Sequence, residues 1–227
     1  AALAGGVIQI NLLVGRQIAS FYDGAVAWLN YADRLYQLPL GVVGIAIGVV
    51  LLPKLSLTVK NKSNSEGTHL INKATEFALI LGLPATAALI IIPLPLISVL
   101  FERGAFTAED SYKTASALMI YGFGLPAFIL QKILAPAFFS RGNTQTPFKF
   151  ALVSMLVNLI TSVGLIKYYG FLAPAIGTTL SGWVMTLLLL NGTRKLGYVI
   201  TFELKKSIIK IGCSTVLMSI FLWYFNI

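Results

Sequence analysis

Charged residues are scarce in this 227-residue chain, and that scarcity decides its class. Only 11% of the residues are charged, 57% are hydrophobic, and the mean hydropathy is +0.84. A soluble domain carries about a quarter charged residues and about half apolar ones, so a soluble enzyme is excluded. Disorder is excluded as well, because an unfolded chain does not tolerate so much apolar surface. The composition predicts an integral membrane protein.

Residues with reactive side chains are equally few. Cys213 is the single cysteine, so the chain forms neither an internal disulfide nor a cysteine metal cluster. His69 is the single histidine, and the absence of an acid or cysteine at catalytic spacing favours a solvated loop residue. Glycine-rich phosphate loops, zinc motifs and nucleophile elbows are missing. We therefore predict no enzyme activity, no cofactor and no resident metal.

Seven hydrophobic stretches are long enough to cross a bilayer, for which a helix needs about 20 apolar residues. The alternating ten-residue strands of membrane barrels are missing, so we predict an all-α bundle of about seven transmembrane helices. The chain begins inside the first stretch, without an initiator methionine or a signal peptide, which predicts a piece of a longer protein. The predicted spans are Ala1–Phe21, Gly24–Leu52, Phe77–Leu100, Thr114–Phe139, Pro147–Tyr168, Phe171–Asn191 and Ile208–Phe225.

Prolines are frequent inside these spans. Each removes a backbone donor and tends to bend a helix. Bends are typical of transporters whose helices move or line a cavity, although each one alone is explained equally well by packing. The prolines are Pro39, Pro84, Pro93, Pro95, Pro126, Pro136 and Pro174.

Basic residues gather on one side of the predicted bundle. Twelve lie on that side, whereas the other side has three, diluted by four acids. This positive-inside bias predicts that the first span runs from the cytoplasm outward. It also assigns the formal charge of +9 to topology and anionic lipid headgroups and not to nucleic acid. The twelve are Lys54, Lys60, Lys62, Lys73, Lys132, Arg141, Lys149, Arg194, Lys195, Lys205, Lys206 and Lys210.

Polar residues on the predicted second span mark the candidate site. Four of them follow the spacing i, i+3, i+4, i+7, which places them on one face of a helix. The same face continues inward with Gly41, Gly44 and Gly48, a stripe that by itself more often reflects helix packing. The four polar residues are Asn30, Asp33, Arg34 and Gln37.

Arg34 lies about 12 Å from the outer end of this span, at 1.5 Å per residue, which is deep for a charge facing lipid. Either it pairs with an acid on another helix and locks the bundle, or it faces a ligand-binding cavity. The cavity is favoured because no other span has a central acid. There the planar guanidinium would bind a phosphate through two hydrogen bonds, with Asp33 holding it or contacting the substrate. Arg16 is a further candidate, although snorkelling to the outer interface is its default interpretation.

Small polar residues cluster on the fifth and sixth spans. Hydrogen bonds between helices are the favoured interpretation, and a small cation site with oxygen ligands is the alternative. The residues are Ser154, Asn158, Thr161 and Ser162 on one span, and Thr178, Thr179, Gly182 and Thr186 on the next.

The chain resembles the MurJ (MviN) family of lipid II flippases in the stretch YADRLYQLPLGVVGIAIGVVLLPKLS, Tyr31–Ser56. This family belongs to the multidrug/oligosaccharidyl-lipid/polysaccharide transporter superfamily. Three further stretches fit it, so the resemblance covers essentially the whole chain. They are GGVIQINLLVGRQIASF, LFERGAFTAEDS and LAPAFFSRGNTQTPFKFALVSMLVN.

The resemblance implies an architecture and a function. Members have about fourteen spans, in two lobes of six plus two more. Residues 1–191 would form the C-terminal lobe and residues 192–227 a cytoplasmic loop and one additional helix, with the N-terminal lobe absent. The implied function is flipping of lipid II, an undecaprenyl-pyrophosphate-linked disaccharide peptide, to the outer leaflet of the bacterial inner membrane. That step supplies peptidoglycan biosynthesis, and with it cell-wall biogenesis and cell shape.

Individual residues are carried over by the same resemblance. Arg34 matches the family's essential cavity arginine in this lobe, and Asp33 matches the acid beside it. Some members hold a sodium ion in this lobe, and Asn158 matches one of its ligands. Asn11 and Ser162 stand where acids are expected, so this chain offers only weak sodium candidates.

Three other functions fit parts of the pattern. The first is export of another polyprenyl-linked glycan, or of cationic drugs, although Arg34 disfavours cationic cargo. The second is a membrane-embedded transferase, which would need a catalytic acid or histidine near the interface. The third is a non-transporting scaffold of the cell-wall machinery, in which replacement of Arg34 would be harmless.

Overall fold

The computed structural model describes residues 15–225, with the backbone alone for Ile45, Ala46 and Phe225. This part of the chain is helical and contains no strand, which confirms the predicted all-α class. Five helical stretches in it are long and apolar enough to cross a membrane, and one of them, residues 145–195, contains two helices. The elements are α2 (Ala25–Lys60), α3 (Asn64–Ile91), α4 (Pro93–Phe101), α5 (Ala108–Phe139), α6 (Gln145–Tyr169), η1 (Gly170–Leu172), α7 (Ala173–Lys195) and α8 (Phe202–Phe225).

Five of the seven predicted spans coincide with helices. The first, Ala1–Phe21, lies largely outside the described residues, although residues 15–19 are helical. The third, Phe77–Leu100, is wrong as a single helix, because α3 ends at Ile91 and α4 begins at Pro93. Two prolines, Pro93 and Pro95, remove neighbouring backbone donors, and the first also forces the preceding residue out of the helical region. That residue, Ile92, has φ −120° and ψ 41°.

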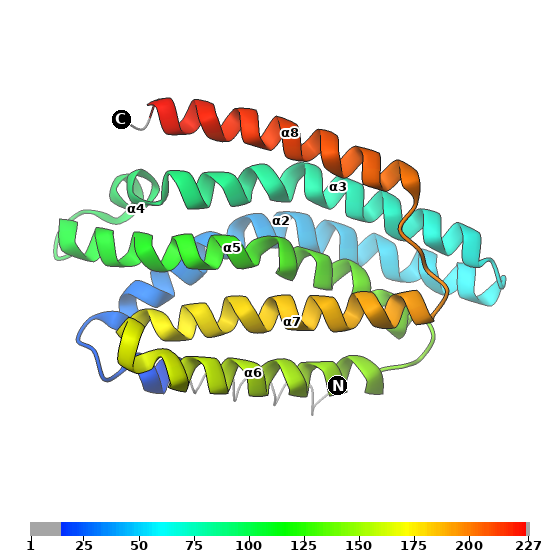
Figure 1. Ribbon diagram of the computed structural model, residues 1–227, viewed down its shortest axis with the longest axis horizontal. Helices are drawn as coiled ribbons and strands as arrows, with labels where there is room; N and C mark the ends of the chain where they lie inside the picture. Colours follow the sequence, from blue (N-terminus) through cyan, green and yellow to red (C-terminus); the bar gives the residue numbers. More distant parts are fainter. Residues whose placement is uncertain (1–14, 226–227) are drawn as a thin grey trace.

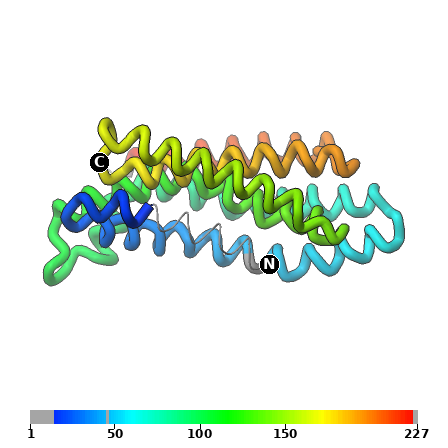
Figure 2. Tube along the Cα trace, turned by 90° about the horizontal axis from the view of Figure 1, so that it is seen from below, coloured from blue at the N-terminus to red at the C-terminus, as the bar shows by residue number. Residues whose placement is uncertain are grey.

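Helix α5 lies at the centre of the bundle (Figure 1). It packs against α2, α3 and α7, while α6 packs on α7 and α8 packs on α3. Its buried face is lined by Leu118, Leu125, Ile129 and Ile133, all fully buried. In the view turned by 90°, α2 lies on the side of the bundle opposite α8 (Figure 2). Helix α5 therefore packs against α2, α3 and α7, and does so from the middle of the bundle.

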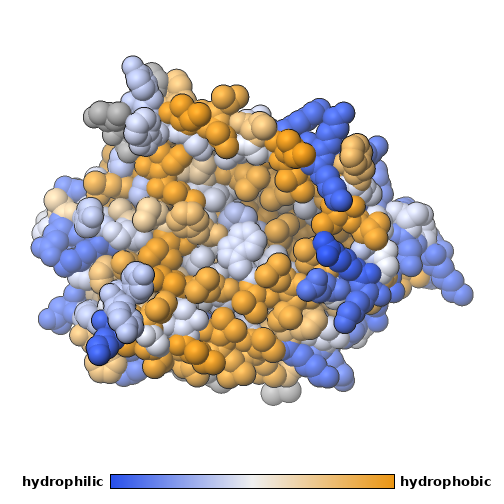
Figure 3. Space-filling view, in the orientation of Figure 1, coloured by the Kyte–Doolittle hydropathy of each residue, from blue (hydrophilic) through white to orange (hydrophobic). Residues whose placement is uncertain are grey.

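The face that carries α7 and α8 is largely apolar, with charged side chains gathered toward its ends (Figure 3). Large hydrophobic side chains are exposed on the outer helices, among them Ile160 on α6, Leu187 on α7, and Val216 and Phe221 on α8. A surface of this kind suits contact with lipid tails, where an apolar side chain incurs no cost of exposure to water.

The α2–α3, α5–α6 and α7–α8 loops, which lie among the basic residues, meet at one end of the bundle. The Arg141 guanidinium, in the α5–α6 loop, donates hydrogen bonds to Asn64 Oδ1 at the start of α3 and to the Leu196 carbonyl after α7, both at 3.1 Å. Helices α2 and α3 extend beyond their predicted spans at this end. His69 consequently lies on α3, where it is exposed; its predicted solvation is confirmed, and its assignment to a loop is wrong.

Candidate functional site

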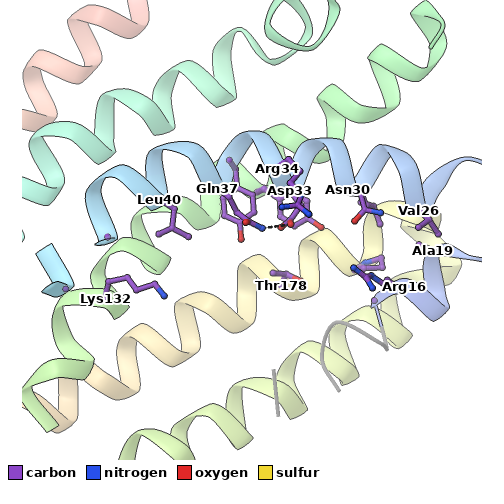
Figure 4. A pocket seen from close by; sticks show the side chains of 18 of the residues that line it. Arg16, Ala19, Val26, Asn30, Asp33, Arg34, Gln37, Leu40, Lys132 and Thr178 are labelled. Carbon is purple, nitrogen blue, oxygen red and sulfur yellow. Dashed lines mark hydrogen bonds between the residues drawn. The ribbon is translucent and has the colours of Figure 1, made fainter. Parts of the chain in front are cut away.

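A cleft of about 870 Å³ lies between α2 and α7, with α5 contributing to its wall. Polar and charged side chains enter it from four segments of the chain (Figure 4). Its polar and charged lining residues are Arg16, Asn30, Asp33, Arg34, Tyr36, Gln37, Tyr121, Lys132 and Thr178. This volume is large enough for a ligand of small-molecule size.

The five residues predicted as substrate-binding all line this cleft: Asn30, Asp33, Arg34 and Gln37 on α2, and Arg16 on the helical residues 15–19. The three glycines of the predicted stripe line it as well. The periodicity of α2 explains the arrangement, because the opposite face of the helix is apolar and packs into the core. Ala32, Leu35 and Val43 lie on that packed face and are at most 9% exposed.

Asp33 is the acid at the centre of the site. It is half-buried and accepts a hydrogen bond from Gln37 Nε2, one helical turn further along α2. Its carboxylate also interacts electrostatically with Arg34 and Arg16. The ion pairs among the described residues join Lys73 to Glu76 and Lys113 to Glu109, so neither engages Arg34. The exposed Arg34 guanidinium is thus free of a salt bridge within this part of the chain and open to the cleft.

Lys132 is a further cation of the site that the sequence did not single out. It is one of the twelve basic residues assigned to the cytoplasmic side, and the structure places it within α5, where it lines the cleft. Figure 4 shows it reaching in from the end opposite Arg16, with Asp33 and Gln37 between them. The sequence does contain a signal for this position. Lys132 lies seven residues inside a predicted span, and a charge there, as at Arg34, is costly unless it faces a cavity.

Two tyrosines form part of the wall and were also missed. Tyr36 and Tyr121 stack with ring centroids 5.2 Å apart and an interplanar angle of 23°. Both are 7% exposed and both line the cleft. Their pairing joins two helices far apart in sequence, so nothing in the periodicity of either helix could reveal it.

The polar clusters on α6 and α7 behave mainly as predicted. Ser154 donates to the Ser181 carbonyl at 2.8 Å, and Thr179 donates to the Ile120 carbonyl of α5 at 2.9 Å. Thr186 donates to the Ala127 carbonyl at 2.9 Å. These hydrogen bonds tie α7 to both of its neighbours.

The weak sodium candidates are only partly described. Asn158 and Ser162 are buried on α6, and the Ser162 hydroxyl donates to Asn158 Oδ1 at 2.8 Å. Asn11 lies outside the described residues. Within residues 15–225, no group of three or more His, Cys, Asp or Glu side chains is placed to hold a metal ion.

The site is chemically suited to an anion. Its basic side chains enter from three segments, while Asp33 is the single acid among the described residues that line it. At membrane depth, a charge that faces lipid costs a few kcal/mol, whereas a charge in a water-filled cleft keeps its hydration until a ligand replaces it. Phosphate and pyrophosphate groups are the anions that arginine binds best.

Comparison with known proteins gives a consistent result. The family described as Lipid II flippase MurJ matches residues 1–227. The probable lipid II flippase MurJ of Rhizobium meliloti (strain 1021) is 48% identical over 191 residues, which cover 83% of this chain and 35% of the relative. The corresponding protein of Rickettsia prowazekii (strain Madrid E) is 39% identical over 183 residues, covering 81% of this chain and 36% of the relative. The chain thus spans about a third of the length of these relatives.

Solved structures agree with the sequence relatives. A lipid II flippase MurJ in an inward closed conformation superposes with a TM-score of 0.85 at 30% identity, covering 97% of this chain and 46% of that one. A MOP superfamily transporter from Pyrococcus furiosus has a TM-score of 0.73 at 13% identity, covering 96% of this chain and 50% of that one. The second similarity shows the fold alone.

Proposed function

The chain belongs to the lipid II flippase MurJ family, and from this premise we propose that it forms one lobe of a transporter that moves lipid II across the bacterial cytoplasmic membrane. It is a multi-pass protein of that membrane. In this proposal residues 1–191 are the C-terminal lobe of the transporter and residues 192–227 a cytoplasmic loop with one additional helix. A second lobe, which would face the cleft, completes the cavity.

The observation that carries the proposal is the basic cleft at membrane depth. Lipid II presents a pyrophosphate between an apolar tail and a polar disaccharide peptide, so its carrier must replace the hydration of that anion inside the bilayer. Arg34 is exposed in the cleft, and Asp33 beside it is held by Gln37. We assign Arg34 to the pyrophosphate, Asp33 to orientation of the guanidinium, and Asn30 and Gln37 to polar headgroup contacts. Arg16 would contact the headgroup toward the outer end.

Transport would proceed by alternating access, with the two lobes rocking about the cleft. The polyprenyl tail stays in the lipid while the headgroup crosses through the polar interior. Binding shifts the equilibrium between inward and outward states only if the cleft contacts the headgroup differently in each. The family is one of transporters, and the proposed cycle contains no covalent step.

The experiment uses the intact protein in cells depleted of their own flippase. Wild type, Arg34→Ala and Arg34→Lys are compared for the amount of lipid II exposed on the outer leaflet. Loss of a charge-assisted, two-pronged contact costs about 1.5–3 kcal/mol, so Arg34→Ala should lower export about 10- to 150-fold. Arg34→Lys, which keeps the charge and loses the fork, should be intermediate.

Two outcomes would contradict the proposal in different ways. Equal export by all three proteins would mean that the headgroup is held without Arg34. If wild type restored growth without exposing lipid II, another polyprenyl-linked glycan would be the cargo. Protein levels in the membrane, measured in parallel, control for folding.

A further inference from the structure

Lys132 crosses α2 at a glycine, where a larger side chain would collide with it. Its side-chain stem lies over Gly44, where a Cβ would come within 3.1 Å of Lys132 Cγ and 3.7 Å of Lys132 Cβ. The neighbouring glycines on the same face, Gly41 and Gly48, have nothing within 4 Å of the position a Cβ would take. The glycine stripe therefore gives the lysine stem room to cross α2, with open space on either side of it.

The ammonium group of Lys132 has no partner among the described residues. No ion pair or hydrogen bond in that part of the chain includes it, and the residue is exposed. A cation inside a span, without an acid beside it, is a costly feature unless it faces water or a ligand. Because Lys132 lines the cleft, its ammonium group can be hydrated there or contact a ligand.

Lys132 and Arg34 lie at different points along the cleft, with Gln37 between them (Figure 4). Ten residues of α2 separate Arg34 from Gly44, which is about 15 Å along the helix axis. The two cations therefore face different stretches of the cleft, which a headgroup moving through it would meet one after the other.

The position of Lys132 identifies which of the two comes first. It lies seven residues before the end of α5 at Phe139, about 10 Å from the end that carries the basic loops. By the positive-inside rule this end is cytoplasmic. Lys132 thus lies between the phosphates of the inner leaflet and the deeper Arg34.

We propose that Lys132 is an entry-side anion site, which takes the pyrophosphate of a polyprenyl carrier from the cytoplasmic leaflet and releases it toward Arg34. The proposal rests on the proposed function and adds a second station to it. Lysine suits a transient contact, since its ammonium is a mobile point charge without the two-pronged geometry of arginine. A charge at the entrance of a site acts on the association rate, whereas a charge at the final position acts on the dissociation rate.

The test replaces the charge and then restores it chemically. The intact protein carries Cys213→Ser, which removes an exposed cysteine on α8 that does not line the cleft, and Lys132→Cys. Reaction with 2-aminoethyl methanethiosulfonate returns an ammonium, while methyl methanethiosulfonate leaves the side chain neutral. Lys149→Cys, on α6 and exposed but not on the cleft, is the matched control. The probe is farnesyl pyrophosphate, and its association and dissociation rates are measured on protein in nanodiscs.

We expect Lys132→Cys to slow association about tenfold at low salt, with the dissociation rate little changed. The mixed disulfide that carries the aminoethyl group should restore the rate and the methyl mixed disulfide should not, while Lys149→Cys should bind as wild type does. Unchanged association, or a faster dissociation with normal association, would overturn the entry-side assignment. Lys132→Arg, with its charge intact, should associate normally and so guards against a folding defect.

Failure of the proposed function would look different. If wild type bound farnesyl pyrophosphate but not lipid II, the cargo would be wrong and the rates with farnesyl pyrophosphate would still judge Lys132. If wild type bound neither probe, both proposals would be overturned together.

Discussion

Gly177 offers a sharp test of how α6 and α7 pack. A Cβ at this position would overlap Ser162 Oγ and Asn158 Oδ1, and would lie 3.0 Å from the backbone oxygen of Asn158. The two side chains could rotate only by breaking their mutual hydrogen bond of 2.8 Å, and the backbone oxygen cannot rotate at all. Gly177→Ala should therefore force the two helices apart.

The magnitude follows from three effects. Overpacking costs about 1–3 kcal/mol and loss of the Ser162–Asn158 hydrogen bond about 0.5–1.5 kcal/mol. Replacing glycine by alanine inside a helix returns about 0.5–1 kcal/mol. Gly164→Ala, also on α6, receives the same helical gain without the clash, because nothing lies within 4 Å of its Cβ position. The comparison of the two variants isolates the packing term.

The assay is thermal unfolding of the intact protein in detergent, followed by size-exclusion chromatography with fluorescence detection. Gly177→Ala should melt about 5–15 °C below Gly164→Ala, by the scaling for chains of this size. Equal melting temperatures for the two variants would refute the close packing of α6 on α7.

Two further predictions concern the ends of the bundle. Trp28→Phe removes the 2.7 Å hydrogen bond from Trp28 Nε1 to Asp110 Oδ1. It should lower the free energy of unfolding by about 1 kcal/mol and the melting temperature by a few degrees. An unchanged melting temperature would mean that this hydrogen bond does not stabilise the outer end. Asn72→Ala removes a donor to the Val199 carbonyl at 2.9 Å, so amide hydrogen exchange in residues 198–207 should accelerate; unaltered exchange there would contradict a role for Asn72 in holding the α7–α8 linker.

The sequence was most informative where one helix carries both a core face and a site face. Helix α2 is such a case, since the i, i+3, i+4, i+7 spacing alone placed Asn30, Asp33, Arg34 and Gln37 together, and the structure puts them on one cleft. Periodicity describes a single helix, however, and contains nothing about which helix lies opposite. The stacking of Tyr36 on Tyr121 and the crossing of Lys132 over Gly44 are contacts between helices, so they emerged only from the fold.

The prolines show a second limit. Pro39 and Pro53 lie inside an uninterrupted α2, and Pro126 and Pro136 inside α5, whereas the helix ends before Pro93. A single proline removes one hydrogen bond, a loss that the neighbouring turns tolerate. The pair at 93 and 95 removes two within one turn. The number of prolines in a span is therefore a poorer predictor of a break than their spacing.

The most direct measurement for the account as a whole is the equilibrium affinity of the intact protein for lipid II in nanodiscs, compared among wild type, Arg34→Ala and Arg34→Lys. If the cleft binds the pyrophosphate through Arg34, affinity falls about 10- to 150-fold in the alanine variant and by a smaller factor in the lysine variant. Equal affinities for all three proteins would contradict the account, because the headgroup would then be held without Arg34.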